Sequence, residues 1–96
     1  MDTERTVKQL SALAQETRLH IYRALVQAGP EGMNPGALIE QLDIGHATLS
    51  FHLKELKSAA LVDAQQQGRF VFYRANFTEM TRLIETLTEN CCARSG

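Results

Sequence analysis

The sequence is short of several residue types, and each shortage excludes a class of protein. Its 96 residues include no tryptophan, two prolines and two cysteines. Its longest apolar stretches span only a few residues, far below the roughly 20 that a transmembrane helix needs. The polar, acidic start Met1-Asp2-Thr3-Glu4-Arg5-Thr6 leads into no apolar segment of a secretory signal. We therefore expect a cytoplasmic protein that makes no contact with a membrane.

The two cysteines are neighbours, Cys91 and Cys92. Adjacent residues can close only a small, strained disulfide ring, which excludes a disulfide staple of the kind that secreted domains use. In a protein without a secretory signal, the pair is best interpreted as two reduced thiols.

A strong charge of one sign is also missing. Ten Lys and Arg residues against eleven Asp and Glu residues give a formal charge of −1, which excludes a wholly basic protein that coats nucleic acid nonspecifically. The charges are unevenly distributed, because residues 46–74 hold four basic and two acidic side chains while both flanking segments are net negative. This mid-chain block predicts a local surface that faces an anionic partner.

Apolar residues at three- and four-residue steps predict amphipathic helices. They cover residues 3–14, 17–28, 46–59 and the segment from Met80 to Cys91. Asn34 and Pro35 have the pattern of an N-cap and a first helical residue, which predicts a further short helix up to Leu42. Asn76 and Glu79 form a capping-box pattern ahead of the last helix. The chain is therefore expected to be mainly helical.

The hydrophobic period changes to two in the second half of the chain. The runs 61–65 and 69–74 are rich in β-branched and aromatic residues and flank Gln66-Gln67-Gly68, which predicts a β-hairpin. Before it, the short helix, the turn over 43–45 and the helix over 46–59 have the spacing of a helix-turn-helix, whose second helix lies in the DNA major groove. The spacing alone leaves a helical protein-interaction module open as the alternative, because such helix pairs also occur in folds that never contact DNA.

The helix over 46–59 has two distinct faces. Leu49, Leu53 and Leu56 fall within one narrow arc and form the predicted inward face. The opposite face is polar apart from one phenylalanine and carries Ala47, Phe51, Lys54 and Ser58. Polar side chains on such a face can reach base edges and phosphates, which favours DNA over a protein partner.

Three segments of the chain carry a family resemblance. They are Leu13-Ala14-Gln15-Glu16-Thr17-Arg18-Leu19, Leu49-Ser50-Phe51-His52-Leu53 and Gly68-Arg69-Phe70-Val71-Phe72-Tyr73. In this order and at this spacing they resemble the ArsR/SmtB family of bacterial winged-helix repressors, and the resemblance covers nearly the whole chain. It implies a single winged helix-turn-helix DNA-binding domain over residues 1–96, mainly α with a small β-hairpin wing, that forms a homodimer through its first and last helices.

The resemblance also implies a partner and a signal. The partner is a double-stranded DNA operator with two-fold symmetry, and the repressor leaves it when a metal or metalloid binds. We expect DNA contacts from the second helix of the motif and from the wing, at His46, Ala47, Ser50, Phe51, His52, Lys54, Lys57, Arg69 and Arg74. For His52 the alternative is packing between helices, and for Arg74 it is an ordinary solvated charge.

Two features depart from the family pattern. Ala60 stands before Leu-Val where the family usually has glycine, which costs about 1 kcal/mol if the backbone needs a positive φ there. The short helix lacks the Cys-x-Cys of some arsenic and lead sensors, and the last helix lacks the Asp/His and His/Glu pairs of the zinc sensors. Neither of these effector sites can be carried over to this chain.

Cys91 and Cys92 remain as the candidate effector site. Some family members that sense trivalent arsenic or antimony have an adjacent cysteine pair here, followed by a further cysteine that this sequence lacks. Trivalent arsenic is a soft centre that prefers sulfur ligands, so arsenite or antimonite is the expected inducer. The alternatives are a structural role, with Cys91 in the core and Cys92 exposed, and a response to thiol redox or to another metal.

The sequence predicts no enzyme, no permanent cofactor and no small-molecule substrate. His20, His46 and His52 are scattered and lack the spacing of a zinc site. The sequence has no phosphate-binding loop and no Ser/His/Asp order, and a core of this size leaves little room for a substrate pocket.

Overall fold

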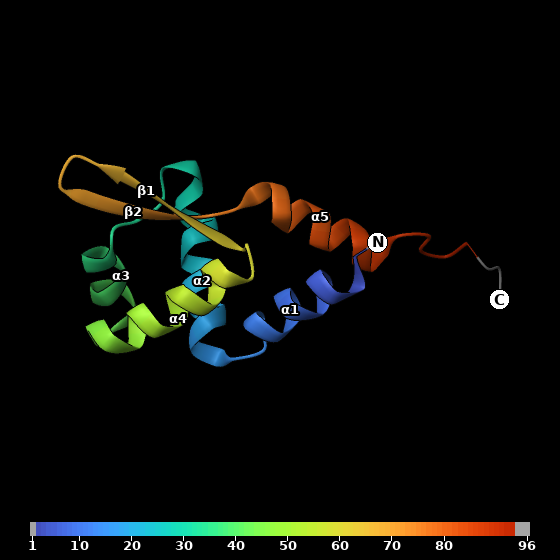
Figure 1. The fold of residues 1–96 in the computed structure, drawn as a ribbon, viewed down its shortest axis with the longest axis horizontal. Helices are drawn as coiled ribbons and strands as arrows, with labels where there is room; N and C mark the ends of the chain where they lie inside the picture. The colour runs from blue at the N-terminus through green and yellow to red at the C-terminus, as the bar shows by residue number, and fades with distance from the viewer. Residues whose placement is uncertain (1, 94–96) are drawn as a thin grey trace.

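The computed structural model describes residues 2–93 of the chain. Its elements are, in order, α1 (Thr3–Leu13), α2 (Glu16–Ala28), a single 3-10 turn η1 (Gly29–Glu31), α3 (Pro35–Leu42), α4 (His46–Ser58), β1 (Val62–Gln67), β2 (Phe70–Ala75) and α5 (Phe77–Thr88). The expected fold class, mainly helical with a β-hairpin wing, is confirmed (Figure 1). None of the helices within residues 2–93 is long and apolar enough to span a membrane.

Side chains at the helix starts determine where the helices begin. Asn34 Oδ1 accepts the backbone N–H of Ala37 at 2.8 Å, and Asn76 Oδ1 accepts that of Glu79 at 3.2 Å. Each bond satisfies an N–H group that has no partner within its own helix, so α3 and α5 begin where the sequence predicts. The capping box at α5 is only half formed, because the Glu79 side chain makes buried contacts elsewhere.

The core lies between α2, α3, α4 and the first residues of the hairpin. Its largest fully buried apolar side chains are Ile21, Leu25, Leu38, Leu49, Leu56, Leu61 and Val62. Leu49, Leu53 and Leu56 are buried together, which confirms the predicted inward face of α4. Burial of each leucine contributes roughly 1.5–3 kcal/mol, so these three residues hold the opposite face of α4 toward solvent.

A short bridge ties the wing to the helical body. Met33 and Tyr73 exchange two backbone hydrogen bonds of 2.8 Å, so the segment before α3 lies beside β2 like a one-residue strand. Gly32 permits this approach, because its φ is 71° and a Cβ atom there would overlap the carbonyl oxygen of Tyr73. Gly32 thus lets the segment before α3 pack directly against β2 of the wing.

The hairpin is longer, and its turn tighter, than the sequence predicts. β1 and β2 pair antiparallel up to the pair Gln67↔Phe70. The turn therefore consists of Gly68 and Arg69, not of residues 66–68. Gly68 has a φ of 64°, which suits a two-residue hairpin turn. Arg69 is thereby placed at the tip of the wing.

The junction between α4 and β1 contains the alanine that departs from the family pattern. Ala60 has a φ of 62°, in the left-handed region that favours glycine. The strained backbone anticipated there is therefore present, at a cost of about 1 kcal/mol relative to glycine. The backbone N–H groups of Ala60 and Leu61 donate to the carbonyl oxygens of Lys57 and Leu56, at 2.9 and 3.1 Å, which fixes the junction in this conformation.

α1 and α5 lie side by side at one end of the elongated molecule (Figure 1). On α1, Val7 and Leu10 are 58% and 40% exposed, whereas Gln9 is completely buried. On α5, Ile84 and Leu87 are 54% and 58% exposed. Val7, Leu10, Ile84 and Leu87 are referred to below as the apolar patch.

Candidate nucleic-acid interface

α4 presents a continuous exposed face. The exposed side chains are His46, Ala47, Thr48, Ser50, Phe51, Lys54, Lys57 and Ser58, with Glu55 at the margin. Phe51 is 58% exposed, and its ring is free to pack on a thymine methyl group. Ser50 and Lys54 can hydrogen-bond bases or phosphates beside it. All the α4 residues predicted to contact DNA, except His52, are thus accessible, and their contact with DNA stays a prediction.

His52 lies on the other side of α4, among packed side chains. It is only 9% exposed, and its Nδ1 atom accepts a hydrogen bond of 3.2 Å from the Arg18 guanidinium. Burial lowers the pKa of His52, and the charge of Arg18 lowers it further against the opposing effect of Glu55. The imidazole meets the ring of Phe51 edge-on, with 5.2 Å between centroids. These contacts favour the helix-packing alternative for His52, and its contact with DNA stays a prediction.

Arg18 is a site residue to which the sequence assigns no role. Its Nε atom donates to the carbonyl oxygen of Ala12 at 2.7 Å, near the end of α1, while its Nη1 atom reaches His52 on α4. One side chain of α2 thus joins α1 to the helix that carries the exposed face. Its place in the first segment of the family resemblance is the signal that marks it.

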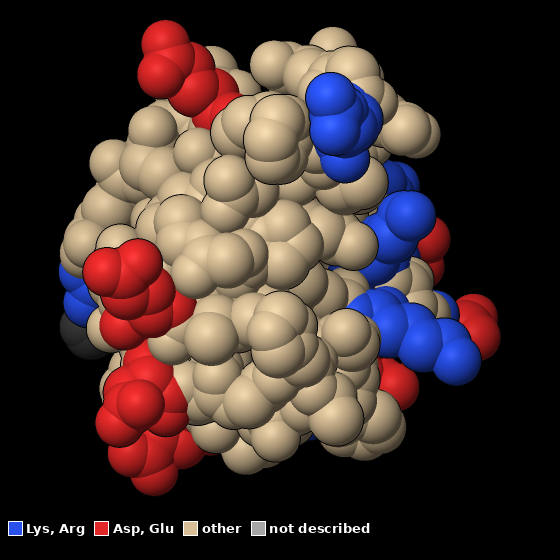
Figure 2. Space-filling view, turned by 90° about the vertical axis from the view of Figure 1, so that its left-hand side faces the viewer, with Lys and Arg blue, Asp and Glu red and all other residues tan. Residues whose placement is uncertain are grey.

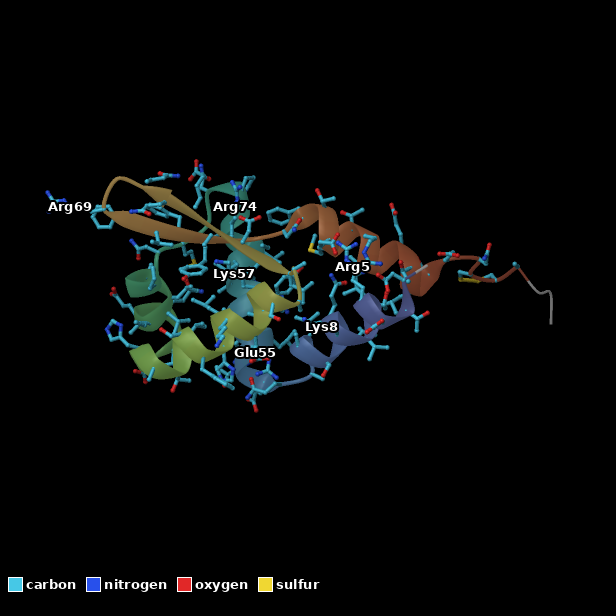
Figure 3. The ribbon with its side chains drawn as sticks, in the orientation of Figure 1. Arg5, Lys8, Glu55, Lys57, Arg69 and Arg74 are labelled. Carbon is cyan, nitrogen blue, oxygen red and sulfur yellow. A yellow bond between two sulfur atoms is a disulfide. The ribbon has the colours of Figure 1, made fainter. Side chains whose placement is uncertain are left out.

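The two wing arginines differ in their surroundings. Arg69 is exposed at the tip of the hairpin and projects away from the body (Figure 3), beside Phe70, which is 60% exposed. Arg74 instead pairs with Asp63 across the hairpin, with 2.7 Å between Nε and Oδ1. This exposed pair adds little stability, but it places a negative charge beside Arg74. Arg69 is therefore the stronger candidate for a phosphate contact, and Phe70 is an accessible wing residue that the sequence does not single out.

Charges are unevenly distributed over the end that carries the wing tip and the start of α4. Figure 2 shows this end: most of the visible Lys and Arg side chains lie along one side, with some Asp and Glu among them, and the other side is mainly acidic. The basic side is the one that faces the viewer in Figure 1, where α4 lies. This distribution matches the anion-facing surface predicted from residues 46–74.

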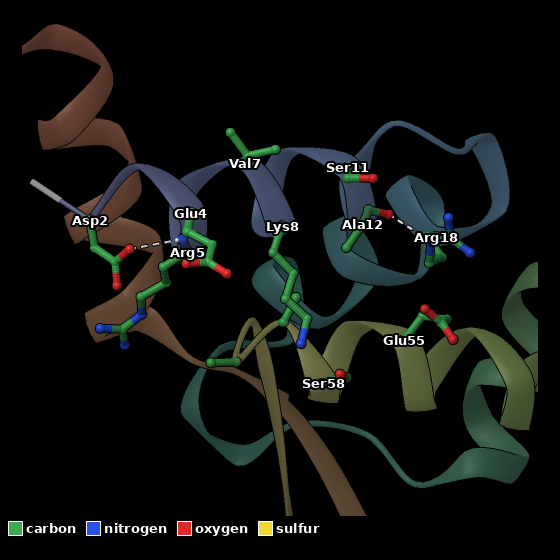
Figure 4. Close-up of a pocket in the computed structure, with 12 residues that line it drawn as sticks. Asp2, Glu4, Arg5, Val7, Lys8, Ser11, Ala12, Arg18, Glu55 and Ser58 are labelled. Atoms are coloured by element: carbon green, nitrogen blue, oxygen red, sulfur yellow. Dashed lines mark hydrogen bonds between the residues drawn. The ribbon is translucent and has the colours of Figure 1, made fainter.

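A groove of about 670 Å³ separates α1 from the C-terminal half of α4 (Figure 4). Lys8 and Ser11 line its α1 wall, and Glu55 and Ser58 line its α4 wall. Its cationic and acidic side chains are equal in number: Arg5, Lys8 and Arg18 against Asp2, Glu4 and Glu55. The groove therefore favours no ligand of one charge sign, but through Ser58 it extends the exposed face of α4 toward α1.

Cys91 and Cys92 lie in a turn beyond α5, not on the helix as predicted. α5 ends at Thr88, whose carbonyl oxygen accepts the N–H of Cys91 at 2.9 Å. Both cysteines are exposed, which excludes the core role considered for Cys91, and their sulfur atoms lie side by side. Within residues 2–93, no three His, Cys, Asp or Glu side chains come together as a metal site. A metalloid bound here would take two sulfur ligands from one chain.

The chain is similar to known repressors over most of its length. Residues 13–65 match a helix-turn-helix domain family. The chain is 36% identical over 84 residues to the biofilm growth-associated repressor of Agrobacterium fabrum, covering 88% of this chain and 69% of that protein. It is 32% identical over 85 residues to the arsenical resistance operon repressor of Bacillus subtilis, covering 88% of this chain and 77% of that protein.

Solved structures show the same fold. An ArsR-like transcriptional regulator from Rhodococcus sp. RHA1 superposes with a TM-score of 0.79 at 27% identity, over 88% of this chain and 77% of that one. HlyU from Vibrio cholerae superposes with a TM-score of 0.74 at 31% identity, over 96% of this chain and 99% of that one. With the helix-turn-helix, the wing and these relatives in agreement, the chain belongs to the ArsR family of winged helix-turn-helix transcriptional repressors.

Proposed function

We propose that this repressor binds a two-fold DNA operator as a homodimer, and that trivalent arsenic or antimony at Cys91 and Cys92 releases it. The observation that best supports operator binding is the exposed face of α4, which the burial of Leu49, Leu53 and Leu56 turns toward solvent. In helix-turn-helix proteins this second helix lies in the major groove.

We assign base contacts and phosphate contacts to different exposed residues of α4 and the wing. Ser50 bonds a base or phosphate, Phe51 packs on thymine methyl groups, and His46 lies at the N-terminal end of α4, where side chains reach base edges. Lys54 and Arg69 neutralise phosphates, so the affinity for DNA falls as the salt concentration rises.

The homodimer is proposed from the apolar patch. Its four side chains, on two adjacent helices, are each at least 40% exposed, which leaves an apolar surface at one end of the single chain. A second copy covers the patch through a contact with two-fold symmetry. This contact places two α4 helices to read two half-sites about one helical turn, or a small multiple of it, apart.

The release step is proposed from the chemistry of the two sulfur atoms. Arsenous acid condenses with two thiols: two As–S bonds form, two water molecules leave, and one hydroxyl stays on arsenic. Arsenic binds the reduced pair, so a disulfide formed between Cys91 and Cys92 would first have to accept two electrons and two protons from a cellular thiol reductant. Soft trivalent arsenic then prefers the sulfur pair to oxygen or nitrogen ligands.

The cysteine pair follows a helix of the proposed dimer contact, so arsenic binding there can change the affinity for DNA. Cys91 and Cys92 follow α5 directly, and α5 carries Ile84 and Leu87 of the apolar patch. Closing this turn around one atom changes the contact between the two copies and thereby the angle between their α4 helices. A coupling free energy of about 1–3 kcal/mol, ordinary for allostery, is enough for release.

The proximity of the two sulfur atoms favours a second candidate, a redox switch in the same cysteine pair. In this case an oxidant takes two electrons and two protons from the thiols, and the operator is released without any metalloid. Both candidates use the same two residues, and they differ in which reagent releases the DNA.

Arsenite is expected to weaken the operator affinity of the reduced wild-type protein by about 5- to 150-fold. The Cys91→Ser, Cys92→Ser double variant is expected to bind the operator as tightly as the wild type without arsenite, and to keep that affinity with arsenite, because it has no thiol to condense with arsenic. Fluorescence anisotropy of a labelled operator during an arsenite titration measures both quantities.

Equal release from both proteins would place the inducer site elsewhere, and no release from either would reject arsenic as the signal. A parallel titration with a thiol oxidant in place of arsenite tests the redox candidate. Release by the oxidant but not by arsenite, lost in the double variant, would assign the cysteine pair to redox sensing.

A further inference from the structure

Gln9 is a buried amide at the meeting point of three helices. Its side chain is completely buried, although Val7 and Leu10 on the same helix are exposed. A buried primary amide is costly unless its N–H groups and its oxygen all find partners. The partners of Gln9 therefore show what its burial achieves.

The Gln9 amide is bonded on all sides. Its Nε2 atom donates to the carbonyl oxygen of Ala59 at 3.1 Å and to Glu79 Oε1 at 2.8 Å. Its Oε1 atom accepts from the Arg82 guanidinium at 2.7 Å. One side chain of α1 is thus bonded both to the end of α4 and to two residues of α5.

Charged neighbours keep this cluster ionised. Glu79 forms ion pairs with Arg5 of α1 and with Arg82 of α5. Burial acts to raise the pKa of Glu79, but the Gln9 hydrogen bond and the charges of Arg5 and Arg82 outweigh it and lower the pKa below its ordinary value. The carboxylate therefore remains a constant acceptor for Gln9 near neutral pH.

The Ala59 carbonyl, which accepts the Gln9 hydrogen bond, lies where α4 ends and the chain leads into the wing. Ala59 is the C-cap of α4, where backbone carbonyls have no partner within the helix. The next residue, Ala60, has a φ of 62°, and the carbonyl of Leu61 accepts the N–H of Asn76 at 2.8 Å. The segment between α4 and β1 is thus hydrogen-bonded to Gln9 of α1 and to Asn76 at the start of α5.

We propose that Gln9 is a positioning residue: its bond to Ala59 fixes the orientation of α4 and the wing relative to the α1–α5 pair, and so determines which half-site spacing the homodimer accepts. The inference rests on the proposed function in one respect, that α1 and α5 form the contact between the two copies. Gln9 then connects each α4 helix to the α1 and α5 helices that form the contact between the two copies.

The test is a Gln9→Met variant, which keeps the length of the side chain and removes its hydrogen bonds. Its affinity is measured on a series of duplexes in which the two half-sites are shifted one base pair at a time. The wild type should have a sharp optimum, since a shift of about two base pairs turns one half-site by roughly 70° about the DNA axis. Gln9→Met should reduce the ratio between optimal and shifted operators by about tenfold, the effect of one lost hydrogen bond.

Two control variants separate positioning from stability. Gln27→Met makes the same substitution at an exposed residue of α2 and should keep the wild-type spacing profile. Arg82→Met disturbs the same buried cluster but leaves the Gln9–Ala59 bond in place, so it should also keep that profile even if it lowers the melting temperature. If Gln9→Met does not fold, Gln9→Asn, whose amide is one methylene shorter, is measured in the same way.

The outcomes are distinct. A wild-type protein without any spacing optimum would reject the proposed two-fold complex itself. A sharp optimum in the wild type that survives in the folded Gln9 variant would overturn the positioning role. Equal flattening of the profile by the Gln9 and Arg82 variants would also overturn it, because the cluster would then act through stability alone.

Discussion

Replacing Leu87 by aspartate is expected to separate the repressor into monomers and to lower operator affinity by about 10²- to 10⁴-fold. Leu87 is 58% exposed on α5 within the apolar patch, and a second copy covering the patch would bury the new carboxylate without a partner. The monomer then binds one half-site and loses the gain from linking two binding events, which accounts for the size of the effect. Sedimentation velocity measures the mass, and anisotropy with labelled operator measures the affinity.

Thr78→Asp is the matched control for this substitution. It adds the same charge to α5, but on the opposite side of the helix, since residues 78 and 87 are separated by about 180° at 100° per residue. The control should remain a dimer with wild-type affinity. A Leu87→Asp protein that sediments as a dimer, or a wild type that is monomeric at tens of micromolar, roughly the working range for a moderate dimer, would contradict the proposed interface.

Replacing Ser50 and Phe51 together by alanine is expected to lower operator affinity by at least about 100-fold at ~0.15 M salt. A good base contact is worth about 1–3 kcal/mol, and a homodimer makes each contact twice. Neither substitution changes a charge, so binding to unrelated DNA and the salt dependence should stay close to the wild type. The affinities for operator and unrelated duplexes are measured in parallel over a range of salt concentrations.

Lys54→Gln on the same exposed face provides the contrast. It should weaken binding to every sequence and reduce the salt slope, because it removes a phosphate contact and not a base contact. If the Ser50, Phe51 double variant keeps the wild-type operator affinity, α4 is not the element that reads the sequence.

The helices could be predicted because their determinants lie close together in the chain. The caps at Asn34 and Asn76 each bond a backbone N–H three residues later. The leucines of α4 repeat within a single helix, so their burial is also a local property. These short-range signals explain why helix starts and the inward face of α4 agree with the sequence.

The role of α1 could be predicted only in part. Its apolar stripe is visible in the sequence, but a pattern does not distinguish a face that packs within the chain from one that awaits a second copy. In the structure Val7 and Leu10 are exposed, and the buried position next to them is Gln9. The partners of Gln9 are 50, 70 and 73 positions away in the chain, so no local signal indicates these contacts.

The burial of His52 and the position of the cysteine pair beyond α5 differ from expectation for separate reasons. At 100° per residue His52 falls on the same side of α4 as Leu56 and Ala59, so the helical period alone predicts its burial. The expectation of a DNA contact comes instead from its place in the Ser-x-His-Leu segment. The position of Cys91 depends on where α5 ends. Helix ends are weakly determined by periodicity, and the stripe continues past Thr88 in sequence but not in structure.

The central claim, that two copies read a two-fold operator, is tested most directly by selecting DNA with the purified wild-type protein from a pool of random duplexes. The account predicts enrichment of inverted repeats whose half-site centres lie about 10 base pairs, or a small multiple of one helical turn, apart. Two chains should be bound on each selected duplex. Failure to enrich any sequence over the starting pool, or enrichment of asymmetric sites bound by a single chain, would contradict the account.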